Sequence, residues 1–356
     1  MDNLSANQNQ PQNSLSEIDK LRQQLQSAKL PANLHDKALQ QIERINLTLK
    51  YGGSMTQLDI TAKYIDWITH IPWETKSEDT LDINKAKAFL DNNHFGLEAI
   101  KRRVLEYLSV LALQKKMTPG SALHASNLFF VGLAGTGKTT FAKSIAEAMG
   151  RKLVRIPFGG LSSALDLRGQ SKTSPEAEPG MVVRALRRAG TRNPVILLDE
   201  LDRCTPESRS SIMGVLIELL DPEQNSGYVD YFIDYPIDLS QCLFVATANN
   251  TNTIATAVMD RLELIQMPSY NDEEKIQIGK RFVLARFMKE SGLTPEQLTI
   301  EDGVWTKMVR PLGFEPGIRS LEREIEGIVR KVAYKIVSGQ GAAFTVTEEN
   351  MKEFVS

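Results

Sequence analysis

A glycine-rich stretch followed by a lysine and two threonines lies in the first half of the chain. Residues 132–139 read GLAGTGKT, and the four residues before them, 128–131, are apolar. Glycines let a loop turn its N–H groups toward phosphates, and a helix that starts at the lysine adds the positive end of its dipole. In this spacing the lysine contacts the β and γ phosphates, and the first threonine ligates Mg²⁺. The stretch predicts a strand, a phosphate loop and a helix that bind ATP and Mg²⁺.

The candidate nucleotide-binding residues of this loop are consecutive. They are Gly132, Leu133, Ala134, Gly135, Thr136, Gly137, Lys138, Thr139 and Thr140. Lys138 is the predicted phosphate contact, and Thr139 is a predicted Mg²⁺ ligand. A glycine-rich turn without chemistry is the alternative interpretation. The apolar run before the loop and the helical spacing of apolar residues after it favour the phosphate loop.

Two acidic residues end a later apolar run. Asp199 and Glu200 follow PVILL, the arrangement known as Walker B when it lies downstream of a phosphate loop. Asp199 would belong to the Mg²⁺ shell, and Glu200 would orient or deprotonate the attacking water. Any buried strand can end in surface acids, so this prediction depends on the phosphate loop. Asn249 ends another apolar run, where it would place an amide near the γ-phosphate or act as an ordinary capping residue.

The elements that must position these residues alternate between strand and helix. Strand patterns at 128–131, 153–158, 195–198 and 242–248, with helical patterns between them, predict an α/β fold with a parallel sheet. Earlier residues show helical spacing, interrupted at Pro31, Pro72 and 92–96. Beyond Pro268 the sheet patterns stop. Helices at 272–290 and 319–337 then predict an all-helical C-terminal domain, followed by a short strand at 344–347.

These patterns predict four parts of the chain. They are a disordered segment, 1–15; an N-terminal helical segment, 16–78; an α/β nucleotide-binding domain, 79–268; and a helical lid domain, 269–356. The first segment is Asn, Gln, Ser and Pro with almost nothing to bury. The helical segment is too short for a substantial core of its own, so we expect it to pack on the next domain or on other subunits.

Composition indicates a soluble protein of 356 residues with 42 basic and 44 acidic side chains. The near-zero net charge gives no field that marks nucleic acid or a membrane as a partner. Two cysteines and four histidines, without a CxxC pair, argue against a disulfide framework or a metal cluster. No apolar run approaches the roughly 18 residues of a membrane span. A cytoplasmic location is therefore expected.

Several stretches resemble the ATPase module of the Lon proteases, a family of AAA+ proteins. They include YIDWITHIPW at 64–73, RRAGTRNPV at 187–195, DPEQN at 221–225 and GIRSLEREI at 317–325. The resemblance covers about residues 16–350. It implies a phosphate-loop sheet with a helical lid, ATP hydrolysis, a homohexameric ring and a protein substrate or partner.

The resemblance also implies roles for residues outside the two nucleotide motifs. Asn249 would be sensor 1, Arg319 the sensor 2 arginine of the same subunit, and Arg261 the arginine finger for the neighbouring nucleotide. The segment Phe95, Gly96 and Leu97 would line the adenine, and residues 226–238 match the hairpin before sensor 1. From the residues alone, the alternative interpretations are a surface ion pair for Arg261 and an ordinary helix N-terminal residue for Arg319.

Two loops depart from this family. Lon-like chains carry an aromatic-aliphatic pair in the first pore loop, whereas residues 168–180 here read RGQSKTSPEAEPG, with Ser174 and Pro175 at the gripping positions. The second pore loop, 203–211, has Ser208 where a bulky apolar residue is usual. Apolar side chains grip an unfolded polypeptide by burying their own surface against it, which serine cannot do.

The sequence therefore predicts an ATP-hydrolysing ring subunit of Lon type that remodels or unfolds protein. No serine has the surroundings of the Lon nucleophile, so peptidase activity is not expected from this chain alone. One alternative is a nucleotide-switched scaffold or regulatory binding protein that threads nothing. Another is the ATPase fragment of a full-length Lon serine protease, because the chain ends near the point where that protease domain would begin.

Overall fold

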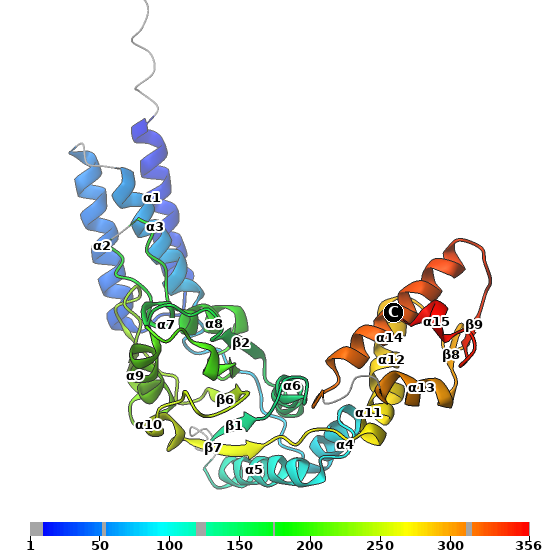
Figure 1. Ribbon diagram of the computed structural model, residues 1–356. Coiled ribbons are helices and arrows are strands. Elements are labelled where there is room, and N and C mark those ends of the chain that lie inside the picture. Colours follow the sequence, from blue (N-terminus) through cyan, green and yellow to red (C-terminus); the bar gives the residue numbers. More distant parts are fainter. Residues whose placement is uncertain (1–9, 52–54, 119–125, 174, 311–314, 356) are drawn as a thin grey trace, which may run out of the picture.

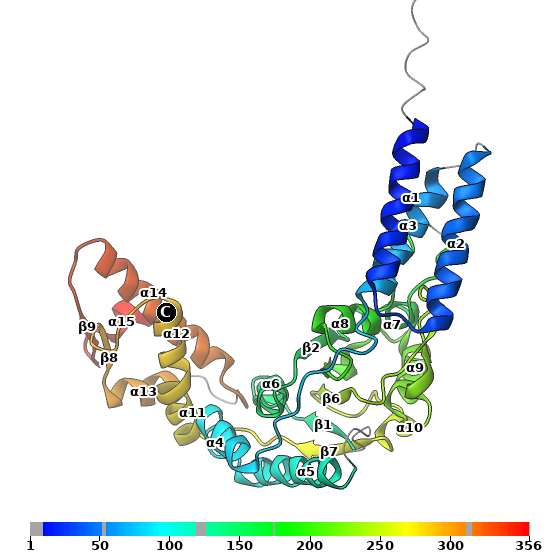
Figure 2. The same ribbon diagram turned by 180° about the vertical axis from the view of Figure 1, so that it is seen from behind.

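The structure is a computed structural model that describes residues 10–51, 55–118, 126–173, 175–310 and 315–355. A bundle of three helices, an α/β body and a smaller lid follow one another along the chain. The bundle and the lid rise from opposite ends of the body, so the molecule has the shape of an open U (Figures 1 and 2). Within the described ranges, no helix is long and apolar enough to cross a membrane.

The body is built on a sheet of five parallel strands in the order β2-β3-β6-β1-β7. Their bounds are β1 Asn127–Val131, β2 Leu153–Pro157, β3 Val195–Asp199, β6 Leu243–Ala248 and β7 Leu262–Gln266. The predicted α/β fold with a parallel sheet is confirmed. The edge strand β7 was not predicted, because only one of its five residues is buried and its pattern is half polar.

Helices cover both faces of the sheet. One face carries α4 Ile83–Asn93, α5 Glu98–Met117 and α6 Lys138–Met149; the other carries α7 Leu165–Arg168, α8 Met181–Ala189, α9 Arg209–Leu220 and α10 Thr256–Met259. Successive strand residues point to opposite faces. In β1, Leu128 and Phe130 therefore join the core under α4, α5 and α6, whereas Phe129 and Val131 join the core under α8 and α9.

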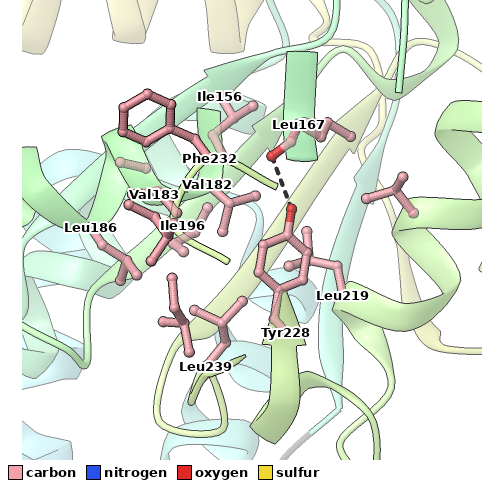
Figure 3. Close-up of a cluster of buried hydrophobic side chains, with 14 of the residues drawn as sticks. Ile156, Leu167, Val182, Val183, Leu186, Ile196, Leu219, Tyr228, Phe232 and Leu239 are labelled. Carbon is pink, nitrogen blue, oxygen red and sulfur yellow. Dashed lines mark hydrogen bonds between the residues drawn. The ribbon is translucent and has the colours of Figure 1, made fainter. Parts of the chain in front are cut away.

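The core on the α8 and α9 side encloses a buried tyrosine (Figure 3). The hydroxyl of Tyr228 donates to the carbonyl oxygen of Leu167 over 2.9 Å, which satisfies a polar atom that would otherwise be costly to bury. Tyr228 belongs to a small antiparallel hairpin of β4 Tyr228–Val229 and β5 Pro236–Ile237. Two 3-10 turns, η1 Leu201–Arg203 and η2 Asn225–Gly227, complete the body. The structure thus contains a hairpin within residues 226–238, as the resemblance implied.

The N-terminal bundle consists of α1 Gln10–Ser27, α2 Ala32–Lys50 and α3 Met55–His70. Helix α1 begins at Gln10, so residues 10–15 are helical and the prediction of disorder through residue 15 is wrong for them. Pro11 lies in the first turn, where a helix needs no N–H from it. Residues 1–9 lie outside the described residues. Buried residues of the bundle and the body form one continuous apolar cluster, so the expected packing on the next domain is confirmed.

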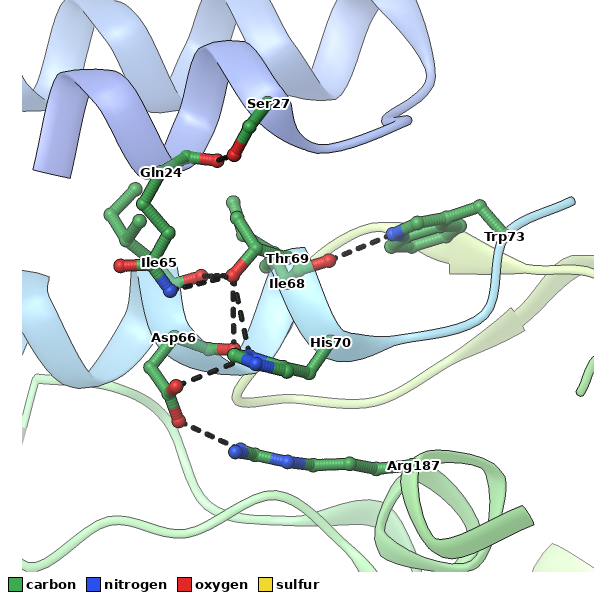
Figure 4. Close-up of polar contacts among 9 residues, drawn as sticks. All are labelled: Gln24, Ser27, Ile65, Asp66, Ile68, Thr69, His70, Trp73 and Arg187. Carbon is green, nitrogen blue, oxygen red and sulfur yellow. Dashed lines mark hydrogen bonds and ion pairs between the residues drawn. The ribbon is translucent and has the colours of Figure 1, made fainter. Parts of the chain in front are cut away.

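Polar contacts also fasten the bundle to the body (Figure 4). A guanidinium nitrogen of Arg187 in α8 lies 2.8 Å from a carboxylate oxygen of Asp66 in α3. The indole N–H of Trp73 donates to the carbonyl oxygen of Ile68 over 2.8 Å, where the chain leaves α3 for the body. The end of α3 is therefore held against α8.

The lid contains α11 Asp272–Ile278, a π-helical turn η3 Gly279–Val283, α12 Leu284–Glu290, α13 Asp302–Val309, α14 Arg319–Val337 and α15 Met351–Phe354. Two short parallel strands, β8 Leu298–Ile300 and β9 Phe344–Val346, pair beside them. The strand predicted at 344–347 is confirmed. The predicted helical lid is confirmed, and β9 pairs with β8, whose three residues give too short a pattern to predict.

Candidate nucleotide-binding site

The phosphate loop, residues 132–137, joins β1 to α6 at the carboxyl end of the sheet. Gly135 and Gly137 have φ angles of 81° and 90°, in the left-handed region that favours glycine. A Cβ atom on Gly132 would lie 2.6 Å from the carbonyl oxygen of Met267, so a side chain has no room there. Helix α6 begins at Lys138. The loop therefore has the backbone shape and the helix N-terminus that the sequence predicted.

Lys138 is buried and reaches across the loop toward the neighbouring strand. Its ammonium donates to the carbonyl oxygens of Gly132 over 2.5 Å and Leu133 over 2.9 Å, and to the amide oxygen of Asn249 over 3.1 Å. Burial lowers the pKa of Lys138, and the positive charge of Arg319 lowers this pKa further. The lysine and the predicted sensor 1 side chain are thus direct neighbours.

Asp199 ends β3 and is almost fully buried. One of its carboxylate oxygens accepts from Nε of Arg155 over 2.6 Å, and the other accepts from the hydroxyl of Thr247 over 2.5 Å. The hydroxyl of Thr139 lies 3.4 Å from the same oxygen as Thr247. The two predicted Mg²⁺ ligands are therefore adjacent. Arg155 and Thr247, which sequence reasoning missed, hold the carboxylate between them.

Glu200 follows in a strained backbone conformation. Its φ of 60° is in the left-handed region, which costs a non-glycine residue about 1–3 kcal/mol. The backbone N–H of Glu200 donates to the hydroxyl of Thr247 over 3.0 Å, which helps to hold this conformation. Its side chain is only 26% exposed, with one oxygen 3.6 Å from Arg203. Strain of this kind is typical of functional positions.

Asn249 lies at the end of β6, beside β3 in the sheet. Its backbone N–H donates to a carboxylate oxygen of Asp202 over 3.2 Å, and Asp202 also lies 3.4 Å from the amide nitrogen of Asn250. Asp202 therefore orients the chain directly after β6. This positioning role could not be read from the sequence, where Asp202 looks like one more acid after the Walker B pair.

A cavity of about 360 Å³ brings most of the predicted residues together. It is lined by Gly135, Gly137, Lys138, Thr139, Thr140, Arg155, Asp199, Glu200, Asn249, Ile318, Arg319 and Glu322. Lys138 and Arg155 from the body and Arg319 from the lid therefore line the same cavity as the two Walker B carboxylates, Asp199 and Glu200. A cavity of this size is in the range that binds small ligands. Such a charge distribution suits a phosphorylated ligand with a metal ion.

The lid contacts the phosphate loop beside this cavity, where Gly317 packs against Gly135. A Cβ atom on Gly317 would lie 2.4 Å from the carbonyl oxygen of Ala134, so the segment before α14 packs directly on the phosphate loop. Arg319, the first residue of α14, reaches the cavity from this segment. The hydroxyl of Tyr270 adds a second link, because it donates to the carbonyl oxygen of Thr136 over 3.0 Å. Tyr270 was not predicted, since a single aromatic residue in a connecting segment carries no motif.

The segment predicted to line the adenine forms the bend between α4 and α5. Gly96 and Leu97 have φ angles of 61° and 56°, and Phe95 packs against the apolar core of the lid. None of these three residues lines the 360 Å³ cavity, which contains the phosphate-loop side chains. Their contact with adenine stays a prediction.

Arg261 lies outside the cavity of its own chain. Its guanidinium donates to the carboxylate of Asp221 over 2.9 Å and to the carbonyl oxygen of Ala257 over 2.8 Å. Beside it is a larger cavity of about 760 Å³, which Arg103 and the buried Tyr107 also line. The ion pair that the residues alone suggested is present. A role toward a neighbouring nucleotide stays a prediction.

The two departing loops are held by contacts of their own. Ser208 is buried, and its hydroxyl lies 2.8 Å from that of Thr205 and 3.2 Å from the carbonyl oxygen of Leu161. Ser208, which stands where the Lon-like pattern usually has a bulky apolar residue, thus anchors the start of α9. Ser174 of the first loop lies outside the described residues.

The first loop, residues 169–180, is fixed to α3 on both sides of its tip. The ammonium of Lys172 lies 4.1 Å from the ring centre of Tyr64, and Glu178 lies 2.5 Å from the ammonium of Lys63. At the base of the loop, the buried carboxylate of Asp230 accepts the backbone N–H of Gly180 over 2.7 Å. Loop 169–180 is thus tied to the N-terminal bundle and to the hairpin.

Comparison with known proteins relates this geometry to two domain families. Residues 128–270 match the ATPase family associated with various cellular activities (AAA), and residues 289–344 match the Lon protease AAA+ ATPase lid domain. Both matches fall on the parts that form the cavity: the first covers the phosphate loop and the Walker B strand, and the second covers the whole of α14.

Curated relatives agree with this assignment. Lon protease 2 of Thermus thermophilus is 38% identical over 346 residues, which are 95% of this chain and 42% of that protein. Lon protease of Dictyoglomus thermophilum is 42% identical over 323 residues, 91% of this chain and 40% of that protein. The chain spans about two fifths of the length of these relatives. With an AAA domain and a Lon lid domain arranged around one nucleotide cavity, the chain is a Lon-type AAA+ ATPase module.

Proposed function

We propose that this protein hydrolyses ATP in a Mg²⁺-dependent reaction, as a subunit of a homohexameric ring, and uses the energy to remodel or unfold protein. The observation that carries the proposal is the 360 Å³ cavity, where Lys138, Glu200, Asn249 and Arg319 meet. Catalysis of phosphoryl transfer depends almost entirely on positioning and on stabilising charge. The cavity supplies positive groups from two domains and the carboxylate of Glu200, which lies 3.6 Å from Arg203.

The positive side chains of the cavity bind phosphate, and the carboxylate of Glu200 acts on the attacking water. Lys138 and Arg319 bind the phosphate oxygens, and the lowered pKa of Lys138 is restored when the negative phosphates replace carbonyl partners around it. Glu200 orients the attacking water and accepts its proton. Asn249, held by Asp202, presents its amide to the γ-phosphate and the water.

Thr139 and Asp199 are the residues that would hold Mg²⁺. Their oxygens fit this hard cation, which prefers oxygen ligands and is bound through one or two protein groups plus phosphates and water. Among the described residues, no group of three or more His, Cys, Asp or Glu could hold a metal ion, so the nucleotide must supply further ligands. When bound, the ion would neutralise charge that develops on the transferred phosphoryl group.

Arg261 acts on the nucleotide of a neighbouring subunit in this proposal. Its position outside its own cavity supports this role, because a guanidinium delivered across a subunit boundary makes hydrolysis depend on assembly. Beside it, α5 exposes the apolar side chains of Val110, Leu113 and Met117, which recur on one face of the helix. Such a stripe suits a buried subunit contact.

A second candidate is a nucleotide-switched scaffold that threads no polypeptide. Loop 169–180 favours it, because Lys172 and Glu178 are engaged by α3 on both sides of the tip. A third possibility follows from the curated relatives, which are named Lon protease: the module could drive an ATP-dependent serine protease of which it forms a part.

Two measurements separate these functions. Purified protein should release phosphate from ATP only with Mg²⁺, and Glu200→Gln should retain bound ATP; absence of both results would refute the ATPase proposal. A folded, tagged reporter protein then distinguishes the outputs. A remodelling enzyme unfolds the reporter with ATP, whereas a scaffold hydrolyses ATP and leaves the reporter folded.

A further inference from the structure

A buried histidine directly precedes the segment predicted to line the adenine. His94 is 6% exposed and ends α4, where its backbone N–H donates to the carbonyl oxygen of Leu90 over 2.9 Å. The next residue, Phe95, packs against the lid core, and its ring lies 5.3 Å from the guanidinium carbon of Arg281. The side chains of His94 and Phe95 therefore point toward different domains, that of Phe95 toward the lid and that of His94 toward the body. His94 is the one that holds the bend to the body.

His94 contacts the helix that begins at the phosphate loop. Its ring stacks on Phe141 of α6, with ring centres 3.8 Å apart and an interplanar angle of 19°. Its Nε2 atom lies 2.9 Å from the hydroxyl of Ser144, one turn further along α6. Phe141 in turn stacks on Phe130 of β1, with ring centres 5.8 Å apart. A column of three rings thus joins the bend to both elements that flank the phosphate loop.

The surroundings keep this histidine uncharged near neutral pH. Burial lowers the pKa of His94 to about 4, and the positive charge of Lys101 contributes to the shift. Lys101 is itself held by Asp91, whose carboxylate lies 2.9 Å from its ammonium. A neutral imidazole can stack on Phe141 and exchange one hydrogen bond with Ser144 without the cost of burying a charge.

We propose that His94 is a positioning residue for the base of the nucleotide. It fixes residues 95–97 on the phosphate-loop helix, so that the site for the base and the site for the phosphates keep a constant separation. The proposal rests on the function proposed above and adds to it a residue that touches neither the base nor the phosphates. Removal of His94 should therefore affect a ligand that carries a base and spare a ligand that consists of phosphates alone.

The experiment compares Mg²⁺-ATP with Mg²⁺-tripolyphosphate, which has no base, as competitors of a fluorescent ATP analogue. His94→Ala should weaken ATP binding about tenfold, since it removes one hydrogen bond and one ring stack, and should change tripolyphosphate binding less than twofold. The KM for ATP should rise about as much, with kcat nearly unchanged. Ser144→Ala and His94→Phe each remove only the hydrogen bond, so each should weaken ATP about two- to fivefold.

Each outcome decides the proposal. Equal loss of both ligands in His94→Ala would show general damage to the phosphate loop and would overturn it. Unchanged ATP binding in His94→Ala, with a wild-type protein that binds ATP, would overturn it and leave the proposed function standing. A wild-type protein that binds neither ligand would overturn both. If His94→Ala does not fold, Ser144→Ala and His94→Phe decide, because both retain a side chain of similar size at the site.

Discussion

The nucleotide cavity and loop 169–180 lie in the same body and differ in what their side chains are free to do. In the cavity, the side chains of Lys138, Glu200 and Arg319 line an open volume. Lys138 also donates to Asn249, and Glu200 lies 3.6 Å from Arg203. In loop 169–180, Lys172 lies on an aromatic ring and Glu178 is ion-paired with α3. The charged side chains of the cavity line an open volume, and those of loop 169–180 contact a neighbouring helix.

This difference indicates where the energy of hydrolysis can act. A loop that grips a polypeptide needs apolar side chains that are exposed at its tip. Here the apolar side chain near the tip, Ala177, is buried, and Pro175 and Glu176 are exposed beside it. Lys172 and Glu178 connect loop 169–180 to α3 of the N-terminal bundle.

Arg261→Ala should give the largest effect, a fall in ATP hydrolysis of about 10³-fold or more with ATP affinity unchanged. In the proposed ring, Arg261 acts on the neighbouring nucleotide, and it does not line the cavity of its own chain. Mixing Arg261→Ala with Glu200→Gln should restore phosphate release, since some boundaries then pair an intact cavity with an intact arginine.

Arg103→Ala is the matched control for this prediction. Arg103 lines the same 760 Å³ cavity and is paired with Glu263 over 3.1 Å, so its loss should change hydrolysis only a few fold. An inactive mixture, or a loss of ATP binding in Arg261→Ala, would contradict the role across the boundary.

Glu200→Gln should lower hydrolysis by about 10²- to 10⁴-fold while ATP stays bound, because the amide cannot accept a proton from water. Phosphate release measures the rate of hydrolysis, and the nucleotide retained after gel filtration measures the bound ATP. Glu207→Gln, an exposed acid in the nearby segment before α9, makes the same chemical change outside the cavity and should leave the rate unaltered. Equal rates in the two variants would remove Glu200 from the mechanism.

The sequence predicted the residues that line the cavity better than the residues that hold them in place. Lys138, Asp199 and Asn249 each end or follow an apolar run, and parallel strands bring such ends to one edge of the sheet, so their meeting followed from pattern alone. Arg155 and Thr247 could not be predicted, because each becomes relevant only through a carboxylate on a neighbouring strand. Local spacing carries no information about partners that meet only through the folding of the sheet.

The errors have a similar origin. The burial of Ser208 could not be predicted from its place in loop 203–211, because it depends on the contact of the start of α9 with Leu161. The strands β7 and β8 were missed because a short or half-exposed edge strand needs few apolar residues. Their partners β1 and β9 had recognisable strand patterns. The hydrogen bonds to these partners hold β7 and β8 in the sheets, although their own patterns are weak.

Acid should change the contributions of His94 and Asp230 to the free energy of unfolding in opposite directions. The pKa of His94 is lowered to about 4, below the ordinary value of 6.5, so the unfolded chain binds its proton first. The His94 contribution to the free energy of unfolding therefore falls, by at most about 3 kcal/mol, as the pH decreases from 6.5 to 4. Burial raises the pKa of Asp230, at the base of loop 169–180, from 3.8 to about 6, so this group favours the folded state as the pH decreases from 6 to 3.8.

Urea unfolding of the wild type and of His94→Gln between pH 7 and pH 4.5 measures the first contribution. Other groups titrate alike in both proteins and cancel in the difference. The wild type should lose stability relative to the variant as the pH falls. Asp230→Asn should show the reverse trend against the wild type. A stability difference that does not vary with pH in either pair would contradict the corresponding assignment.

The smallest effect concerns the ion pair between Lys63 and Glu178. Both side chains are partly exposed, so a double-mutant cycle of Lys63→Ala and Glu178→Ala should give a coupling below about 1 kcal/mol. The more informative measurement is hydrogen exchange at a single backbone N–H of the loop. The backbone N–H of Gln170 donates to the carbonyl oxygen of Glu178 over 3.1 Å, so its hydrogen exchange should accelerate in Lys63→Ala if α3 holds the loop.

The pair of Arg22 and Glu43 provides the matched control, because it joins α1 to α2 over 2.9 Å without touching the loop. Arg22→Ala should leave the exchange of Gln170 unchanged, although it removes an ion pair of similar exposure from the same bundle. Faster exchange in both variants would mean that the loop follows the general stability of the bundle. Faster exchange in Lys63→Ala alone would show that α3 restrains loop 169–180 directly, and therefore that the region which departs most from the Lon pattern is joined to the bundle rather than free to grip a polypeptide.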